Sequence, residues 1–268
     1  MTTTTIHRVA LCIEYQGTQY CGWQRQLECE SVQGHVERAI SSIANEAVTI
    51  QCAGRTDTGV HSVGQVVHFD TTADRPSSAW VRGANTKLPF DIRIAWAQPM
   101  DSEFHARFSA IARQYRYVIY NRKVHSAVLA QRVTWQSVKL NETLMHEAAQ
   151  SLLGEQDYQS FRASACQAAH AKREIQSISV KRQGDFVLID IQANAFLHHM
   201  VRNIAGTLME VGRGERPVSW VKELLAMQDR TKAGPTAHPF GLYFVNALYP
   251  EHFEIPRVKL DEVLWQCQ

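Results

Sequence analysis

Paired cysteine patterns are missing from this chain, although it contains six cysteines. None of them forms a C-x-x-C pair, and none is spaced with histidine as in a zinc site. Histidine is more frequent, with twelve residues, but the only adjacent pair, His198 and His199, would not face one way on a helix. We therefore expect no disulfide framework, no zinc site and no other metal.

Long apolar runs and a strong net charge are also missing. No segment approaches the roughly 20 apolar residues of a membrane-spanning helix. The first five residues lack the charged start and apolar core of a signal peptide, so we expect a cytoplasmic protein without a membrane partner. The net charge is only +2, so an argument for a nucleic-acid partner must depend on where the charges lie.

Acidic residues are missing from one long stretch, between Glu103 and Glu142. Basic residues recur throughout it, at Arg107, Arg113, Arg116, Arg122, Lys123, Arg132 and Lys139. A second acid-free stretch, residues 158–173, carries Arg162, Lys172 and Arg173. Solvated strand edges would give such a pattern, but a surface that contacts phosphates explains it better.

The 268 residues are 45% hydrophobic, enough for one large domain or two modest ones. In the first part, residue patterns predict strands at 8–15, 47–53, 63–70 and 92–96, a helix capped by Ser31 and a helix at 77–87. In the second, they predict strands at 114–120, 175–182, 186–192 and 241–248 and helices at 142–153, 197–211 and 220–227.

The strand–helix–strand–strand–helix–strand order of the first part is typical of the ferredoxin-like, or split βαβ, fold. The second part repeats it less cleanly. We predict an α+β protein with two ferredoxin-like halves and an active-site cleft between them. Residues 1–108 would form the first half, and residues 109–268 the second half with the acid-free, basic stretches.

The segment Gly54-Arg55-Thr56-Asp57-Thr58-Gly59-Val60-His61-Ser62 concentrates reactive groups between two predicted strands. Its glycines and threonines predict a tight loop that holds Asp57 in one orientation. A plain turn would use the same residue types. Asp57-Thr58-Gly59 also matches the aspartic protease tripeptide, but no second such tripeptide is present, and the preceding residues are polar rather than apolar.

Three further features offer weaker signals. On the strand Arg113-Gln114-Tyr115-Arg116-Tyr117, the tyrosines would lie on one face and Arg116 on the other. A tyrosine there could stack on a base, or simply fill the core. The aromatic residues Tyr20 and Trp23 beside Arg25 offer the same two alternatives. On the helix at 197–211, Arg202 would point away from the buried stripe, together with Ala205 and Met209.

These segments, with 196–203 and Gly241-Leu242-Tyr243-Phe244, resemble the motifs of the TruA family of tRNA pseudouridine synthases over nearly the whole chain. Thr58 and Ser62 stand where the family has alanine, two small departures. The resemblance implies a homodimeric, cofactor-free isomerase that converts uridine to pseudouridine at positions 38, 39 and 40 of the tRNA anticodon stem-loop.

Matched to the family motifs, Asp57 would be the nucleophile and Tyr115 the residue that stacks on uracil. Arg55 would present the flipped base, Arg202 would pair with Asp57, and Leu242 would line the pocket. An aspartate can attack either C1′ or uracil C6, and both routes remain open.

Two other activities fit some of these residues. A non-catalytic RNA-binding protein would use the same cations and aromatics but would not need Asp57, and a hydrolase using Asp57 would release uracil. The closing segment, 251–268, contains Trp265 and is expected either to pack on a partner subunit or to be loosely held.

Overall fold

The computed structural model describes residues 5–259 and has a mixed α/β fold that is rich in sheet and has few helices. This confirms the expected α+β class. The chain forms two compact units. Of the described residues, the first unit contains 5–111 and 244–259, and the second contains Ala112–Tyr243. No helix in the described part of the chain is both long and apolar enough to cross a membrane.

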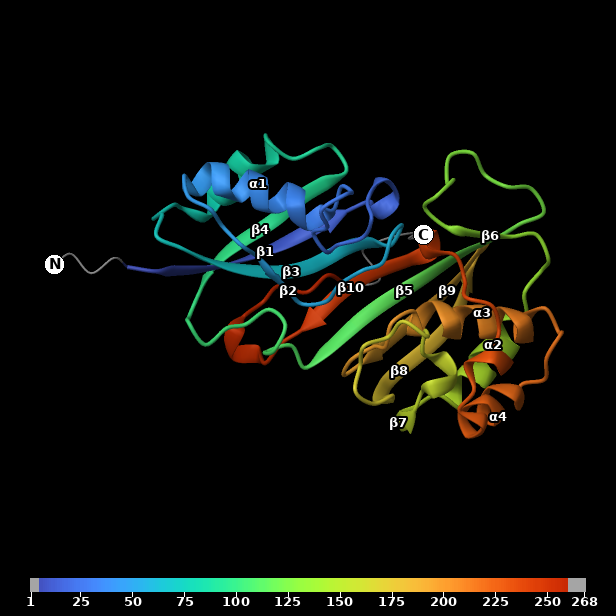
Figure 1. The fold of residues 1–268 in the computed structure, drawn as a ribbon. Coiled ribbons are helices and arrows are strands. Elements are labelled where there is room, and N and C mark those ends of the chain that lie inside the picture. Colours follow the sequence, from blue (N-terminus) through green and yellow to red (C-terminus); the bar gives the residue numbers. More distant parts are fainter. Residues whose placement is uncertain (1–4, 260–268) are drawn as a thin grey trace. The chain divides into compact units, whose positions relative to one another are not determined.

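The first unit is built on an antiparallel sheet (Figure 1). In it, β4 pairs with β1, β1 with β3, and β3 with the short β2, which is the strand order of a ferredoxin-like sheet. The bounds are β1 His7–Tyr15, β2 Gln51–Cys52, β3 His61–Thr71 and β4 Ile92–Met100. The four predicted strands are thus confirmed, although β2 is much shorter than the expected 47–53.

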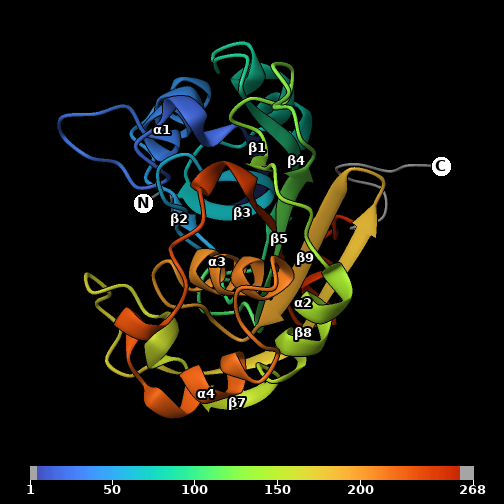
Figure 2. The same ribbon diagram turned by 90° about the vertical axis from the view of Figure 1, so that its right-hand side faces the viewer.

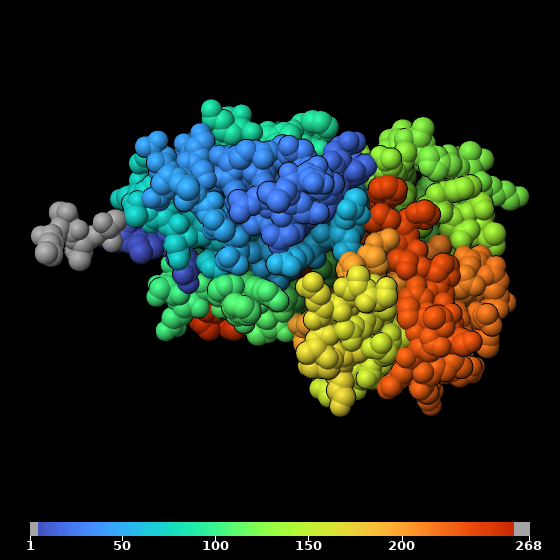
Figure 3. All heavy atoms as spheres, in the orientation of Figure 1, coloured from blue at the N-terminus to red at the C-terminus, as the bar shows by residue number. Residues whose placement is uncertain are grey.

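Helix α1 (Val32–Ala44) covers this sheet, and the Ser31 side chain caps it by accepting a hydrogen bond from the Gly34 N–H, as predicted. Residues Val36 and Ile40 of α1 are fully buried with the inward side chains of β1, β3 and β4. The second predicted helix is a short helical segment that includes the π-helix Ala79–Gly83. In the space-filling view, α1 and the loop before it, in blue, form much of the near surface of this unit (Figure 3).

Strand β10 (Leu242–Leu248) begins in the second unit, and its residues from Phe244 belong to the first. There the Ser62 hydroxyl donates a hydrogen bond to the Phe244 carbonyl at 3.2 Å. The backbone approaches closely at Gly64, where a Cβ would lie 2.0 Å from the Val245 carbonyl oxygen. The return of the chain to this sheet therefore supports β3, the strand that follows the Asp57 loop.

His68 on β3 gives the first unit an expected sensitivity to acid. It is 4% exposed, and its Nδ1 accepts a hydrogen bond from the Ala106 backbone N–H at 3.1 Å. Burial lowers the pKa of His68 to about 4, with further lowering from His105 and Arg8 and an opposing effect of Asp70. The folded protein thus keeps this imidazole neutral at a pH where the unfolded chain protonates it.

We therefore expect the free energy of unfolding to decrease as the pH falls from about 6.5 to about 4, because the unfolded state then binds more protons. His68 contributes at most roughly 3 kcal/mol to this decrease in the free energy of unfolding. Urea unfolding at stepped pH measures the slope. His68→Gln keeps a hydrogen-bond acceptor and should reduce the slope of the unfolding free energy against pH. His7→Gln, at the half-exposed start of β1, should leave this slope unchanged. Identical slopes in wild type and His68→Gln would contradict the assignment.

The second unit has an antiparallel sheet in the order β5-β9-β8-β7, with β6 parallel to β5. Its strands are β5 Ala112–Asn121, β6 Thr134–Gln136, β7 Gly154–Asp157, β8 Lys172–Gln183 and β9 Phe186–Ala193. The predicted hairpin is confirmed, with Gly184 at its turn at a φ of 55°. The sequence did not predict β6 and β7, which are only three and four residues long.

Helices α2 (Glu142–Gln150), α3 (Met200–Gly212) and α4 (Trp220–Met227) belong to the second unit, and α2 and α3 lie side by side (Figure 2). All three were predicted, but α3 begins later than the expected 197. His199 adopts a left-handed φ of 60°, so the helix cannot include it. Helix α3 is also buried on more than one face, since Ala205 is fully buried and Met209 is 8% exposed. The prediction that these two residues face away from the core with Arg202 is therefore wrong.

We expected no disulfide framework, but one pair of cysteines is bridged. Cys21 and Cys29 form a disulfide across the loop before α1, with Cα atoms 6.2 Å apart. Their spacing of eight residues matches no common motif, and the pairing arises because the loop folds back onto itself. The 260–268 part of the closing segment, including Trp265, lies outside the described residues.

Candidate active site

Asp57 lies in the loop that connects β2 to β3, as predicted. The Val60 N–H donates to the Asp57 carbonyl at 3.1 Å and closes a tight turn. Gly59 has a φ of 80°, the value that the third position of a type II turn requires and that side-chained residues avoid. The Asp57 side chain is half-buried, and Arg55 two residues earlier is exposed. The loop thus places a cation and a carboxylate close together in the chain.

Side chains from β1 and β3 hold this loop from within the first unit. Gln65 on β3 binds both backbone groups of Gly54: its Oε1 accepts from the N–H at 3.3 Å and its Nε2 donates to the carbonyl. The hydroxyl groups of Tyr15 and Thr56 share a hydrogen bond of 2.8 Å. Burial raises the pKa of Tyr15, so this phenol stays neutral. The residues on either side of Arg55 are therefore fixed by buried partners.

The loop after β1 packs against the same turn from the other side. A Cβ on Gly17 would lie 1.9 Å from the Val60 carbonyl oxygen, and the Gly17 N–H donates to Nδ1 of His61 at 3.1 Å. That bond fixes Nδ1 as the unprotonated nitrogen of His61. The sequence showed a glycine here but not its role, which depends on a contact with a residue 43 positions later in the chain.

Gly22 lies against the backbone of Thr56 and Asp57. Its φ is 87°, and a Cβ there would lie 2.6 Å from the Thr56 carbonyl oxygen and 3.1 Å from the Asp57 carbonyl carbon. The next residue, Trp23, donates its backbone N–H to the same Thr56 oxygen at 3.0 Å. Because only a glycine leaves room at this position, the backbone of Asp57 is set by the path of the β1–α1 loop.

The aromatic residues of that loop are structural. Tyr20 is 5% exposed and Trp23 is 1% exposed, and both belong to the core of the first unit. The Tyr20 hydroxyl donates to Asp91 at 2.6 Å, and the Trp23 ring lies 5.8 Å from the ring of Tyr15. Of the two alternatives read from the sequence, base stacking and packing, the structure favours packing for both residues.

Tyr115 lies on β5 in the second unit. It is 8% exposed and contacts the edge of Phe196, with ring centroids 5.0 Å apart. Arg116, on the opposite face of the strand, forms a two-point ion pair with Asp190 of β9, directly across the sheet, at 2.7 and 2.9 Å. Arg116 is thus a structural residue rather than a phosphate contact. Tyr115 lies on the other face of the strand, as the alternation of side chains along the sequence predicted.

Arg202 and Leu242 also belong to the second unit. Arg202 on α3 is half-buried, and its Nε donates to the Ala237 carbonyl at 2.9 Å, while its own carbonyl accepts from the Ala237 N–H at 3.1 Å. Leu242 is 5% exposed at the start of β10. Of the five candidate residues, the first unit thus holds Arg55 and Asp57 on one loop, and the second unit holds the other three.

Most basic residues of the long acid-free stretch are exposed. The exposed ones are Arg107, Arg122, Lys123, Arg132 and Lys139, and Arg113 is half-exposed. Arg122 also donates to the Tyr120 hydroxyl at 2.7 Å. Only Arg116 is withdrawn into the protein, so the stretch still presents positive charge to solvent.

Comparison with known proteins decides the family. A family model described as tRNA pseudouridine synthase matches residues 11–109 and 148–250. The chain belongs to this family. A tRNA pseudouridine synthase A from Hydrogenovibrio crunogenus is 65% identical over 97% of this chain and 99% of its own length. The protein of that name from Shewanella piezotolerans is 56% identical over 94% and 97%, respectively.

Solved structures are more distant. A chain of the archaeal box H/ACA sRNP Nop10–Cbf5 complex aligns with 9% identity and a TM-score of 0.35, over 88% of this chain and 47% of that chain. The family membership confirms the resemblance to TruA that the sequence motifs indicated and makes the protein an isomerase, as expected.

Proposed function

We propose that this protein isomerises uridine to pseudouridine in the anticodon stem-loop of tRNA, at positions 38, 39 and 40, with Asp57 as the nucleophile. The observation that carries the proposal is the carboxylate of Asp57 on a turn braced by Gly17, Gly22 and Gln65, in a member of the tRNA pseudouridine synthase family. A plain turn would not need such contacts from two other segments of the chain, the β1–α1 loop and β3.

The reaction requires one bond exchange. The N1–C1′ bond of uridine breaks, a C5–C1′ bond forms, C5 loses a proton and N1 gains one, so no oxidant, reductant or net water is consumed. We therefore propose that the enzyme needs no cofactor and no metal. A carboxylate can form the covalent intermediate at C1′ or at uracil C6.

The target base must leave the stacked helix before it can react, which costs a few kcal/mol. We propose that Arg55 holds the extruded nucleotide and that Tyr115 stacks on the uracil. Arg202 would pair with Asp57, and Leu242 would line the pocket. The exposed cations of the acid-free stretch would contact tRNA phosphates. We further propose that the protein is cytoplasmic and forms a homodimer. Light scattering would measure its oligomeric state.

Incubation of the purified protein with unmodified tRNA tests the activity. Pseudouridine at positions 38 to 40 supports the proposal. Tight binding without conversion would indicate a non-catalytic RNA-binding protein, and released uracil would indicate a hydrolase. Pseudouridine maps of cellular tRNA with and without the protein would then identify the tRNAs and positions that it modifies.

Substitution of Tyr115 separates the role of its ring from that of its hydroxyl. We expect Tyr115→Ala to lower kcat/KM by about tenfold to a hundredfold, since stacking on a base contributes roughly 1–3 kcal/mol. Tyr115→Phe keeps the ring and should lose much less. Tyr120→Ala, on the same strand and 6% exposed, controls for loss of a buried ring. Equal losses in the Phe and Ala variants of Tyr115 would mean that the hydroxyl, not the ring, is required.

A further inference from the structure

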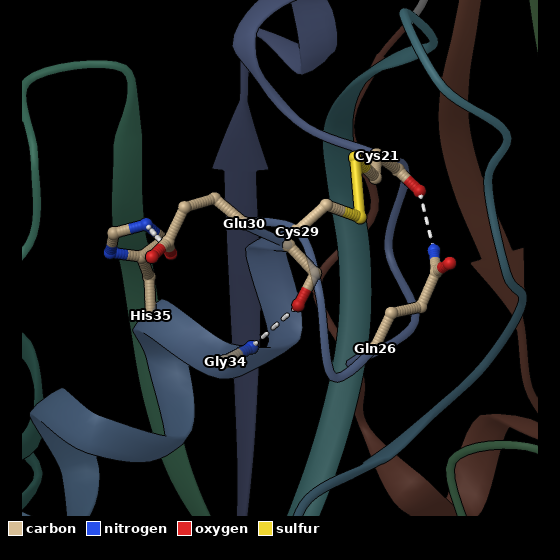
Figure 4. The surroundings of a disulfide bond; sticks show 7 residues. Cys21, Gln26, Cys29, Glu30, Gly34 and His35 are labelled. Carbon is tan, nitrogen blue, oxygen red and sulfur yellow. Dashed lines mark hydrogen bonds and ion pairs between the residues drawn. A yellow bond between two sulfur atoms is a disulfide. The ribbon is translucent and has the colours of Figure 1, made fainter.

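The disulfide lies next to the glycine that contacts the Asp57 backbone. Cys21 and Cys29 close a loop between β1 and α1 (Figure 4), and both residues are half-buried rather than enclosed in the core. Gly22, directly after Cys21, is the residue whose Cα lies against Thr56 and Asp57. One of the two bridged cysteines is therefore the direct neighbour of a glycine that supports the Asp57 loop.

Backbone hydrogen bonds continue from the bridge to the loop. The Cys21 N–H donates to the Glu30 carbonyl at 2.9 Å, and the Gly22 carbonyl accepts from the Val32 N–H at 3.3 Å. Trp23 then donates to the Thr56 carbonyl at 3.0 Å. The two cysteines thus hold together the two ends of a segment whose first residues set the position of Asp57.

Beyond Trp23, the residues inside the bridged loop do little to hold it closed. Residues 25–28 are exposed, and Leu27 has no burial at all, at 104%. The Gln26 side chain donates to the Cys21 carbonyl at 3.0 Å, as Figure 4 shows, and Arg25 contacts Gln33 and Glu37 of α1. Trp23 is buried in the core of the first unit, whereas residues 24–28 make few buried contacts, so the disulfide is a covalent constraint on this outer part of the loop.

We propose that Cys21 and Cys29 are positioning residues for Asp57, and that their thiol–disulfide state sets the turnover of the enzyme. A low-molecular-weight thiol attacks one sulfur to form a mixed disulfide, and a second thiol releases it. The products are two protein thiols and one small disulfide, so two electrons pass to the protein. The reverse exchange restores the bridge. The proposal rests on Asp57 being the nucleophile. It agrees with a general property of disulfides in cytosolic proteins, which are commonly transient and redox-sensing.

The test compares the full-length enzyme in its oxidised and dithiothreitol-reduced forms, with the bridged fraction measured by alkylation and mass spectrometry. We expect reduction to lower kcat for uridine isomerisation by on the order of tenfold, because small displacements of a reacting group are costly, and to leave KM unchanged. Glutathione disulfide should restore kcat. Cys21→Ser and Cys29→Ser should each have the kcat of the reduced enzyme and no longer respond to dithiothreitol.

Cys166→Ser is the matched control, since Cys166 is also half-buried but lies in the second unit and is not bridged. It should retain both wild-type kcat and the response to reductant. Equal kcat in the oxidised and reduced wild-type enzyme would overturn the proposal, as would an oxidised enzyme without the bridge, or a change confined to Tm. These outcomes are separable from the role of Asp57, because an active Asp57→Asn enzyme would refute that role directly.

Discussion

Replacing Asp57 by Asn is expected to lower kcat for pseudouridine formation by at least about a thousandfold, the scale on which loss of a nucleophile acts in other covalent enzymes. The amide has nearly the shape of the carboxylate, and the turn is held by the backbone groups of Thr56, Asp57 and Val60, so the fold should persist. An amide, however, is a very poor nucleophile toward C1′ or C6. Single-turnover assays with excess enzyme measure the chemical step without interference from product release.

Binding separates this effect from a general loss of affinity. The Kd of Asp57→Asn for tRNA should stay within a few fold of wild type, or decrease slightly, because removal of a negative charge reduces repulsion of phosphate. Asp74→Asn makes the same charge change at an exposed position of the first unit and should keep full activity. Turnover by Asp57→Asn above about a tenth of wild type would exclude Asp57 as the nucleophile.

Local patterns predicted the elements of this fold well where one physical signal dominates. Ser31 marked the start of α1 because its side chain caps the helix, and the eight residues of α4 matched their predicted range. The start of α3 was missed because the left-handed backbone of His199 has no clear sequence signal. Strand β2 was overpredicted because β-branched residues before Gln51 favour a strand, but the backbone N–H groups of Val48 and Ile50 donate to side chains of α1 instead of to a neighbouring strand.

The sequence predicted the loop with Asp57 and Arg55, but not the residues that contact this loop. Asp57 and Arg55 stand in a motif of contiguous residues, which a sequence shows directly. Gly22 contacts the Asp57 backbone across more than thirty positions of the chain, and Cys21 pairs with Cys29 only because the loop doubles back. Such contacts depend on the tertiary path of the chain, so a single sequence shows the glycine and the cysteines but not what they touch.

Gly22→Ala is expected to lower kcat by on the order of tenfold to a hundredfold by displacing Asp57. The new Cβ would lie 2.6 Å from the Thr56 carbonyl oxygen, closer than carbon and oxygen can approach, and that neighbour is backbone and cannot rotate away. The φ of 87° adds strain of roughly 1–2 kcal/mol for a residue with a side chain. Steady-state kinetics at a temperature well below the measured Tm would report the change in kcat.

Gly154→Ala provides a matched control, because Gly154 has nearly the same φ, 86°, and no neighbouring atom lies within 4 Å of the place that a Cβ would take. This variant carries the backbone strain without the clash, so it should lower Tm and leave kcat unchanged. If Gly22→Ala behaved in the same way, with a lower Tm and wild-type kcat, the contact between Gly22 and the Asp57 backbone would have no part in catalysis. A loss of kcat in Gly22→Ala alone would show that the path of the β1–α1 loop sets the position of the nucleophile.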